Sequence, residues 1–550
     1  MAAIHCTAPE RSRIMSTQLR AMQHVALEWS YRSGVGRPDP FNEIELDVEV
    51  TGPNGQTVRV PGFWGGDDLW RVRFAPPEPG EYACRSVCKD ERDGGLHGQT
   101  CTITADPYTG SNELLRHGPL RVSENRRHLE HADGTPFFYL ADTWWMGLGR
   151  RLHWPDEFQS LTTHRVNQGY TAIQIVGGPY PDMDATDPRG MNEVGWPWEK
   201  DFARVNPAYY DMADLRIQHL VSRGLVPCIV GCWGYYLMVL GVEKMKRHWR
   251  NLVARYGAYP VIWCLAGEGS MPYYLSESKE ADAAAQKTGW CELGQYVHRI
   301  DPVGHPVTIH PTSRGRQQVD DDSVLDLEML QTGHGGAAAL GNTVTCVEAA
   351  RAQEPPMPYF DSEVSYEGIL GRCGEEIQRY LFYACALRGT CGHTYGANGI
   401  WQFSREDDPY GASPHGAGWG DTPWQEAAHL RGGEQVGMAK QLWVKYPWWQ
   451  MEPYPDAVEP TEGEPEEMKP VCAGIGDQLR FIYFATPLGP WSGKPKVRGL
   501  AVSATYRVLS FDPRHGREHA VDDVATDASG VAELPSPPFI QDWVYVLERA

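Results

Sequence analysis

The chain has 550 residues, which exceeds the size at which a single hydrophobic core stops growing and indicates about three domains. Hydrophobic residues make up 41% of it, so it can bury real cores and is not disordered overall. Its formal net charge of −21 argues against a nucleic-acid or anionic-membrane partner, because binding to phosphate depends on clustered Lys and Arg.

The first residues and the cysteines bear on the compartment. Residues 1–22 form a polar leader that lacks the apolar region of a secretory signal, and no run of about 18 apolar residues is present to span a membrane. The 13 Cys are an odd, scattered set, and Cys228, Cys264 and Cys385 lie inside apolar runs, which is typical of buried reduced thiols. We therefore expect a cytoplasmic protein.

An alternating pattern fills residues 23–110. Aliphatic residues occupy every second position of 44–50 with acidic residues between them, and four further segments continue the alternation. Pro-Asn-Gly at 53–55 and Pro-Glu-Pro-Gly at 77–80 are typical turn sequences. Short strands at regular spacing without a helical period predict an N-terminal β-sandwich.

The period changes within residues 111–450, where short apolar runs alternate with helical patterns. The runs predicted as strands cover 137–141, 172–176, 226–230, 261–265, 307–310, 325–330, 359–362 and 390–395, and the main predicted helices cover 156–168, 209–223, 242–256, 281–299 and 375–387. Strands that are apolar throughout imply burial on both faces. Eight such units predict an α/β domain of the (β/α)₈ TIM-barrel type, closed by a helix at about 432–445.

The last hundred residues divide into two stretches. Residues 451–470 are acidic and rich in proline, so we expect a linker that cannot pack a core. Residues 471–550 return to the period of two and predict a C-terminal β-sandwich.

Two of the predicted barrel strands end at glutamates. Glu268 follows the run Val261-Ile-Trp-Cys-Leu-Ala-Gly, and Glu363 follows Pro358-Tyr-Phe-Asp-Ser. Catalytic residues of such barrels lie at the carboxyl ends of strands, and the fourth and seventh strands face each other across the mouth. Glycoside hydrolysis requires one protonated and one ionised carboxyl group. The pair therefore predicts a glycosidase, against the alternative that each acid caps a helix or pairs with Arg.

Other predicted strand ends supply the planar hydrogen-bonding groups and stacking rings that suit sugars, in a chain with 20 Trp and 26 Tyr. We expect substrate to be bound by Asp142, Trp144, Trp145, Gln174, Trp233, Tyr235, His310, Gln331, His334, Tyr366 and Trp401. For Asp142 a buried structural acid is the alternative, and for each ring it is ordinary core packing. The long loop 177–206 is expected to wall one end of the cleft, which favours removal of terminal sugars; the alternative is a surface insertion.

Other chemistries find little support. There is no His-Glu-x-x-His motif or cluster of His ligands, so we expect no metal ion and no cofactor. A Gly-x-Ser-x-Gly nucleophile elbow is also missing, and the glycine-rich run 333–341 lacks the Lys-Ser/Thr of a phosphate loop.

Three of these stretches together resemble a known family. The run from Pro136-Phe-Phe-Tyr-Leu-Ala-Asp-Thr-Trp-Trp145 through Trp263-Cys-Leu-Ala-Gly-Glu268 to Asp361-Ser-Glu363 and Tyr366-Glu367 resembles the apiosidase-like glycoside hydrolases. Residues 23–107, with Pro61-Gly-Phe-Trp-Gly-Gly66, resemble the β-sandwich often found ahead of that barrel. Residues 471–550 are similar to the small C-terminal module that is often described as collagen-binding.

This resemblance implies roles for the two acids. Glu268 would be the acid/base and Glu363 the nucleophile of a retaining, exo-acting glycosidase, with pentofuranosides such as apiosides or arabinosides among the candidate substrates. The chain departs from the family in having Glu268 where Asp is common, and from the larger clan in having Gly267 where Asn is common. Both departures leave the sugar open.

An alternative from another class is a catalytically silent carbohydrate-binding protein that keeps the barrel as a scaffold. A third reading is a metal-dependent barrel hydrolase. In the first two cases the expected partner is an oligosaccharide or glycoside, with no nucleic acid and no membrane, and the chain is a candidate homo-oligomer.

Overall fold

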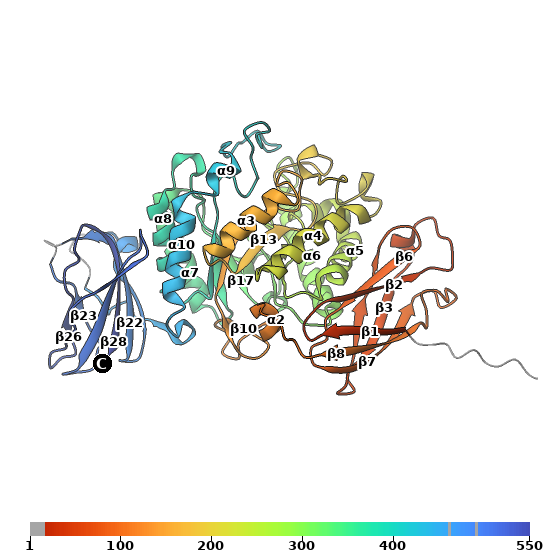
Figure 1. Cartoon of the computed structure of the whole chain (residues 1–550). Helices are drawn as coiled ribbons and strands as arrows, with labels where there is room; N and C mark the ends of the chain where they lie inside the picture. The colour runs from red at the N-terminus through yellow and green to blue at the C-terminus, as the bar shows by residue number, and fades with distance from the viewer. Residues whose placement is uncertain (1–16, 460–463, 490–492) are drawn as a thin grey trace, which may run out of the picture.

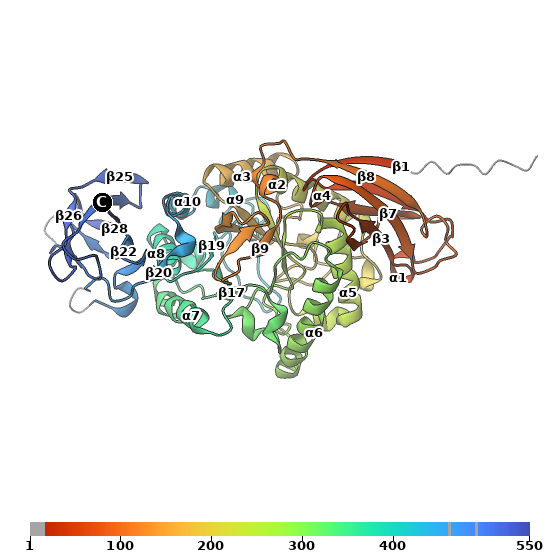
Figure 2. The same ribbon diagram turned by 90° about the horizontal axis from the view of Figure 1, so that it is seen from below.

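The computed structural model describes residues 17–459, 464–489 and 493–550. Three parts follow one another along an elongated molecule: a β-rich N-terminal part, a central part of helices and strands, and a β-rich C-terminal part (Figures 1 and 2). This order agrees with the predicted α/β domain between two β domains.

The N-terminal part contains two sheets. The five-stranded sheet runs β1 (Thr17–Met22), β8 (Thr100–Asp106), β7 (Gly80–Cys88), β3 (Leu46–Thr51), β4 (Thr57–Pro61), and the three-stranded sheet runs β2 (Leu27–Arg32), β6 (Leu69–Phe74), β5 (Phe63–Trp64). As the alternation predicts, Leu46, Val48 and Val50 are buried. The leader is shorter than predicted, since Thr17–Met22 pairs in parallel with β8. Residues 1–16 of the leader lie outside the described residues.

The central part contains eight parallel strands in two sheets. Six form the sheet β16 (Val307–Thr308), β15 (Ile262–Cys264), β14 (Val226–Val230), β13 (Ala172–Val176), β12 (Tyr139–Trp144), β19 (Gly392–Tyr395), and two form the pair β17 (Glu328–Gln331), β18 (Tyr359–Glu363). Nearly all residues of these strands are buried, as apolar runs flanked by helices require. All eight predicted strands are present, although β15, β16, β17 and β19 are shorter than predicted.

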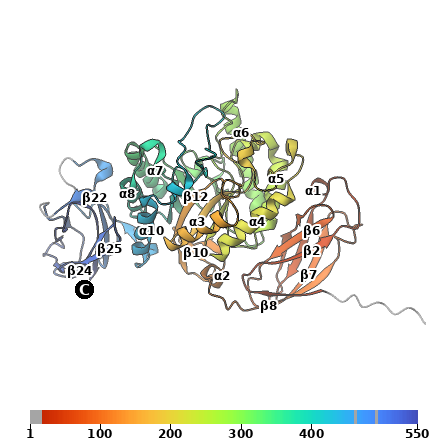
Figure 3. The same cartoon turned by 45° about the horizontal axis from the view of Figure 1, so that its top comes forward.

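Helices pack around these strands. They are α3 (Asp156–Asn167), α4 (Pro207–Ser222), α5 (Tyr236–Tyr256), α6 (Lys279–Ile300), α7 (Leu340–Ala352), α8 (Glu375–Ala386), α9 (Trp424–Ala427) and α10 (Arg431–Trp443). Helix α5 lies beside the N-terminal part, whereas α7, α8 and α10 lie beside the C-terminal part (Figures 1 and 3). Helix α7 was not predicted, and it begins within the glycine-rich run 333–341.

A register shift between β17 and β18 decides where Glu363 points. Leu330 is opposite Asp361, but the next residue of β17, Gln331, is opposite Glu363, so β18 carries one extra residue there. The ring of Phe360, just before the extra residue, packs on that of Tyr139 of β12, with the ring centroids 4.5 Å apart. Such an irregularity re-aims the side chain that follows it. Here it brings Glu363 beside Gln331.

The C-terminal part is built on one large sheet. Its order is β20 (Glu452–Pro453), β21 (Val471–Ile475), β22 (Leu479–Leu488), β28 (Gln541–Arg549), β24 (Thr505–Asp512), β25 (Arg517–Ala520), with β23 (Lys496–Val497) and β27 (Ala532–Glu533) forming a separate pair. The expectation that 451–470 cannot pack a core is wrong for its first residues. β20 pairs with β21, and Ala457 and Val458 are buried in the core of this part.

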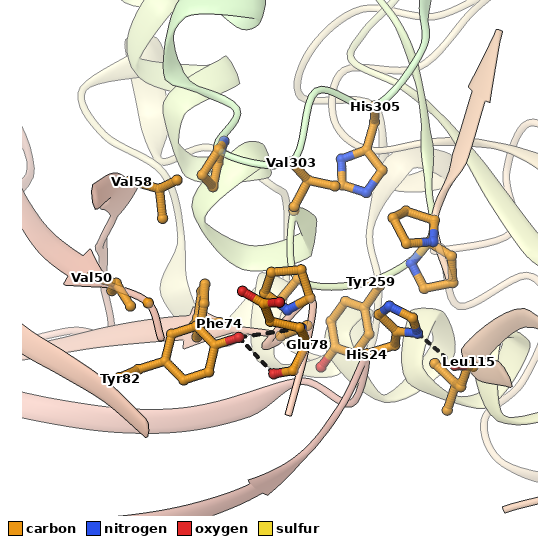
Figure 4. Close-up of a pocket in the computed structure, with 18 of the residues that line it drawn as sticks. His24, Val50, Val58, Phe74, Glu78, Tyr82, Leu115, Tyr259, Val303 and His305 are labelled. Atoms are coloured by element: carbon orange, nitrogen blue, oxygen red, sulfur yellow. Dashed lines mark hydrogen bonds between the residues drawn. The ribbon is translucent and has the colours of Figure 1, made fainter. Parts of the chain in front are cut away.

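Buried ion pairs attach both β-rich parts to the centre. Arg73 of β6 contacts Asp214 of α4 at 2.5 Å, and Arg379 of α8 contacts Asp542 of β28 at 2.8 Å. The junction of the N-terminal sheets with the centre encloses an apolar cavity of about 230 Å³, whose lining includes Val50, Tyr82 and Tyr259 (Figure 4). The lining residues that belong to the central part, such as Tyr259 and His305, precede β15 and β16. The cavity therefore lies at the amino ends of these strands.

Candidate active site

Glu268 and Glu363 line one pocket of about 240 Å³, at the carboxyl ends of β15 and β18. The amide Nε2 of Gln331 donates to both, at 3.3 Å from Glu268 Oε1 and 2.9 Å from Glu363 Oε1. The sum of these distances, 6.2 Å, is the largest separation that the two carboxylate oxygens can have. Two acids far apart in the sequence are therefore neighbours in space.

The backbone at Glu268 is held in an unusual conformation. Its φ of +47° lies in the left-handed region, which residues other than glycine rarely occupy. The indole Nε1 of Trp233 donates to Glu268 Oε2 at 3.2 Å. A Cβ on Gly267 would lie 2.2 Å from the ring of Trp233, so glycine is the residue that fits before Glu268 here. Trp233 therefore accounts for both the glycine and the orientation of the acid.

The surroundings of Glu268 favour its protonated form. Burial, and next the negative charge of Glu363, raise the pKa of Glu268 to about 7. A carboxyl group with this pKa can donate a proton in mildly acidic and neutral solution.

The surroundings of Glu363 act in the opposite direction. Burial pushes the pKa of this carboxyl upward, but the imidazoles of His310 and His334 outweigh it, and the pKa lies well below its usual range. His334 Nε2 lies 2.9 Å from Glu363 Oε1, and His310 Nε2 lies 3.2 Å from Oε2. Although burial lowers the pKa of His334, Glu363 raises it on balance, so the two groups stabilise each other's charged forms.

Aromatic rings form the rest of the wall. Trp145 Nε1 donates to the hydroxyl of Tyr366 at 3.1 Å, and the ring of Tyr366 stacks at an angle of 28° on that of Trp401. Trp233 packs edge-on against Trp145, with ring centroids 5.7 Å apart. Rings fixed in this way offer flat apolar surfaces beside the two acids.

The structure brings most of the predicted residues together. Those lining the pocket are Trp145, Trp233, Glu268, Gln331, His334, Glu363, Tyr366 and Trp401. His310 does not line the pocket but lies behind Glu363. Its position favours control of the Glu363 charge over contact with a sugar.

Four further predicted binding residues lie outside the pocket lining. Asp142 is fully buried, and its Oδ2 accepts from Arg165 Nε at 2.6 Å and from Trp144 Nε1 at 2.7 Å. Asp142 therefore corresponds to the alternative stated for it, a buried structural acid. Trp144 is likewise fully buried and lies in the core. Gln174 is fully buried and donates to the backbone oxygen of Ser362 at 2.8 Å. The hydroxyl of Tyr235 donates to backbone oxygens of loop 177–206, including that of Met183 at 3.0 Å.

Several lining residues were not among the predicted ones. They are Pro181, Asp182, Met271, Tyr274, Ile369, His415 and Trp419. Pro181 and Asp182 belong to loop 177–206, so the expected wall is present, and the others lie on loops after β15, β18 and β19. Loop residues follow no hydrophobic period, so the sequence pattern did not reveal them. Only the unusual length of loop 177–206 indicated that this loop contributes to the pocket.

Two other kinds of feature are absent from the described part of the chain. No group of three or more His, Cys, Asp or Glu residues is placed there to hold a metal ion. Within the same residues, no helix has both the length and the apolar character needed to cross a membrane.

The chain resembles known proteins over most of its length. In solved structures, a glycoside hydrolase family 5 protein from Bacteroides vulgatus is 24% identical, with 79% of this chain and 93% of that chain covered and a TM-score of 0.64. A protein from the same organism, solved as a candidate glycoside hydrolase, is 17% identical, with coverage of 97% and 100% and a TM-score of 0.69. At these identities the likeness shows a shared fold. A comparison with curated proteins gave no match.

Two family models match the N-terminal and central parts of the fold. Residues 19–89 match a domain of unknown function, DUF5060, which corresponds to the N-terminal sheets. Residues 123–450 match the model described as "Apiosidase-like, catalytic domain", which covers more than half of the chain and includes both Glu268 and Glu363. The chain therefore belongs to the Apiosidase-like family, and it is a glycosidase.

Proposed function

We propose that this glycosidase retains the anomeric configuration of its substrate, with Glu363 as nucleophile and Glu268 as acid/base. The observation that carries the proposal is the shared donor Gln331, which limits the separation of the carboxylate oxygens to 6.2 Å. Retaining enzymes have their two carboxyl groups about 5–5.5 Å apart, whereas inverting enzymes need about 6.5–9.5 Å to fit a water molecule. The observed limit favours retention.

The two protonation states suit the two steps of this mechanism. The ionised Glu363 attacks the anomeric carbon and forms a glycosyl ester, while Glu268 gives its proton to the departing oxygen. Glu268, now a carboxylate, removes a proton from water, and the hydroxide so formed displaces Glu363 from the sugar. His310 and His334 keep Glu363 charged, and Trp233 orients Glu268 through its indole N–H.

The loops around the pocket favour cleavage of a terminal sugar. Asp182 accepts hydrogen bonds from Tyr274 and Trp419, and the rings of Tyr274 and His415 lie 4.5 Å apart. Loops following β13, β15 and β19 therefore meet at one side of the pocket. A pocket walled in this way accommodates the end of a glycan better than its middle. Family resemblance adds pentofuranosides to the candidate substrates.

We also propose that the eight parallel strands close into a barrel. Cys391 N donates to Tyr359 O at 2.9 Å, and Asp326 N donates to Val307 O at 2.8 Å. These bonds link the pair β17–β18 to both edges of the six-stranded sheet. A closed barrel would place the carboxyl ends of all eight strands at one mouth. A cytoplasmic location and homo-oligomer formation remain predictions.

A screen of nitrophenyl glycosides, pentofuranosides included, tests the function. Proton NMR of the first-formed product from the best substrate gives the stereochemistry. We expect release of a terminal sugar with its anomeric configuration retained, and no loss of activity with a chelator. Inversion would contradict the proposed roles of the two acids. Binding of sugars without cleavage in the whole panel would favour a silent carbohydrate-binding protein.

A further inference from the structure

We propose that Asp182 determines the substrate class of this pocket, by accepting hydrogen bonds from two adjacent hydroxyl groups of a neutral terminal sugar. This inference rests on the proposed function and deepens it. It predicts that neutral glycosides are accepted and that uronides and other anionic glycosides are rejected.

Asp182 is a buried carboxylate without a cationic partner. It is 8% exposed and lines the same pocket as the two catalytic glutamates. In the described residues, its side chain makes no ion pair with Lys, Arg or His. The guanidinium of Arg189, on the same loop, donates to the backbone oxygen of Asp182 at 3.3 Å but forms its ion pair with Asp187, at 2.6 Å. Burying a charged carboxylate is costly unless hydrogen bonds compensate for the lost water.

The protein supplies only part of that compensation. Tyr274 Oη donates to Asp182 Oδ1, and Trp419 Nε1 donates to Oδ2 at 3.2 Å. Each carboxylate oxygen can accept two hydrogen bonds, so each keeps one acceptor position. Two acceptor positions on one planar carboxylate match two hydroxyl groups on neighbouring sugar carbons. Burial raises the pKa of Asp182, and the two protein donors oppose this rise.

The backbone holds this carboxylate in place before a ligand arrives. Asp182 has a φ of +55°, a strained value for a residue other than glycine. Its two donors come from two other loops, those after β15 and β19. The ring of Tyr274 in turn packs edge-on against His415. Because three loops fix the carboxylate, little further ordering is needed when sugar binds.

The charges of the pocket point to the class of sugar. Its lining contains three carboxyl groups, those of Asp182, Glu268 and Glu363, together with two imidazoles, and none of the lining residues is Lys or Arg. One of these imidazoles, that of His334, is already paired with Glu363. The other, that of His415, lies within hydrogen-bonding distance of Ser413 Oγ and packs against the ring of Tyr274. Asp182 and Glu363 would repel a carboxylate or sulfate group on the sugar, and no Lys or Arg of the lining could bind it, which disfavours anionic glycosides.

Asp182→Ala and Asp182→Asn test the proposal, with Asp184→Ala as the matched control. Asp184 lies on the same loop, is exposed, and accepts from Tyr273 at 2.7 Å without lining the pocket. The measurement is kcat/KM for the best neutral glycoside from the screen and for its monodeoxy analogues. We expect Asp182→Ala to lower kcat/KM by about 10- to 100-fold for each lost hydrogen bond. The control should stay within about threefold of the unsubstituted protein.

The deoxy analogues make the test specific. If Asp182 binds two adjacent hydroxyls, removing either hydroxyl should weaken the substrate for the unsubstituted protein but have little further effect in Asp182→Ala. If the loss of kcat/KM from removing a hydroxyl and the loss from Asp182→Ala were additive, the proposal would be overturned. Equal activity of Asp182→Ala and Asp184→Ala would overturn it as well. Cleavage of the matching uronide as fast as the neutral glycoside would overturn the charge argument. Equal thermal unfolding midpoints of the variants exclude misfolding as the cause.

A binding experiment separates this inference from the proposed function. Calorimetry with the free neutral sugar compares Glu363→Gln with the double variant that also carries Asp182→Ala. Weaker binding by the double variant supports the role of Asp182, and equal binding overturns it, whether or not the intact chain cleaves glycosides. An intact chain that binds sugar through Asp182 but cleaves nothing would contradict the proposed function alone.

Discussion

Glu268 and Glu363 accept hydrogen bonds from the same nitrogen, Nε2 of Gln331, yet their pKa values are shifted in opposite directions. Two like charges this close disfavour each other, so one acid must take up the proton. The imidazoles of His310 and His334 lie beside Glu363 and stabilise its charge, so the proton resides on Glu268. The environment of each acid therefore assigns its role.

This assignment predicts how activity depends on pH. Activity requires the proton of Glu268, whose pKa is about 7, so kcat/KM should fall about tenfold per pH unit above that value. Glu363 has a depressed pKa and loses its charge only in strongly acidic solution. The profile should therefore be bell-shaped with its plateau on the mildly acidic side, measured with an aryl glycoside. Constant activity between pH 5 and 8 would contradict the pair.

Replacing Glu268 with Gln should affect substrates according to their leaving groups. The amide cannot donate a proton to the departing oxygen, so glycosides of alcohols or sugars should lose about 10²- to 10⁴-fold in kcat. Nitrophenyl glycosides, whose leaving group needs little assistance, should lose far less in the first step. The descending limb of the pH profile should also disappear. An equal loss for both kinds of substrate would argue against an acid role.

Replacing Glu363 with Ala removes the proposed nucleophile and should lower kcat by about 10⁴-fold or more. The cavity left behind can admit a small anion. We therefore expect azide to restore part of the activity and to yield a glycosyl azide of inverted configuration, which NMR identifies. Glu367→Ala is a useful comparison, because Glu367 is also buried near this strand end but binds Tyr395 at 2.6 Å. If azide restored activity to Glu367→Ala and not to Glu363→Ala, the nucleophile would be Glu367.

Much of this arrangement was predictable from local pattern. Apolar runs of four to six residues predicted the parallel strands because such strands are buried on both faces, and two of these strands lead into Glu268 and Glu363. Side-chain direction at a strand end was harder to predict. Asp142 follows the predicted strand 137–141, but β12 continues to Trp144, and Arg165 of α3 approaches the carboxylate from within the core. Arg165 lies in the helix that follows β12, and no local sequence pattern shows that its side chain points toward Asp142.

Irregular backbone escaped sequence analysis for a related reason. The extra residue in β18 beside Gln331 changes which side chains face the pocket, although the apolar run itself reads as a regular strand. Loop residues such as Asp182 and Trp419 meet only through contacts between distant segments. The acidic segment 451–470 was expected to be a free linker, because its composition hid residues that are buried, among them Ala457 and Val458.

The buried position of Asp142 gives a prediction about stability. Both members of the Asp142–Arg165 pair are fully buried, with Nε 2.6 Å from Oδ2. Asp142→Ala leaves an unpaired buried guanidinium and should destabilise the protein by about 3–5 kcal/mol. Asp68→Ala is the control, since the Asp68–Arg32 pair is exposed and is worth about 0–1 kcal/mol. Thermal and denaturant unfolding measure both. A change in KM without loss of stability would restore Asp142 as a sugar ligand.

The contact between Gly267 and Trp233 gives the last prediction. In Gly267→Ala the new Cβ would lie 2.2 Å from the indole ring, which must shift and so weaken its hydrogen bond to Glu268 Oε2. We expect activity to fall more than tenfold, because displacing an orienting group by about 1 Å can cost about 100-fold. The descending limb of the pH profile should move as well, since Glu268 changes its surroundings. Gly341→Ala is the matched control: it lies in α7, nothing stands within 4 Å of its Cβ, and alanine favours the helix by about 0.5–1 kcal/mol. If both variants kept full activity and an unchanged pH profile, Trp233 would not position the acid.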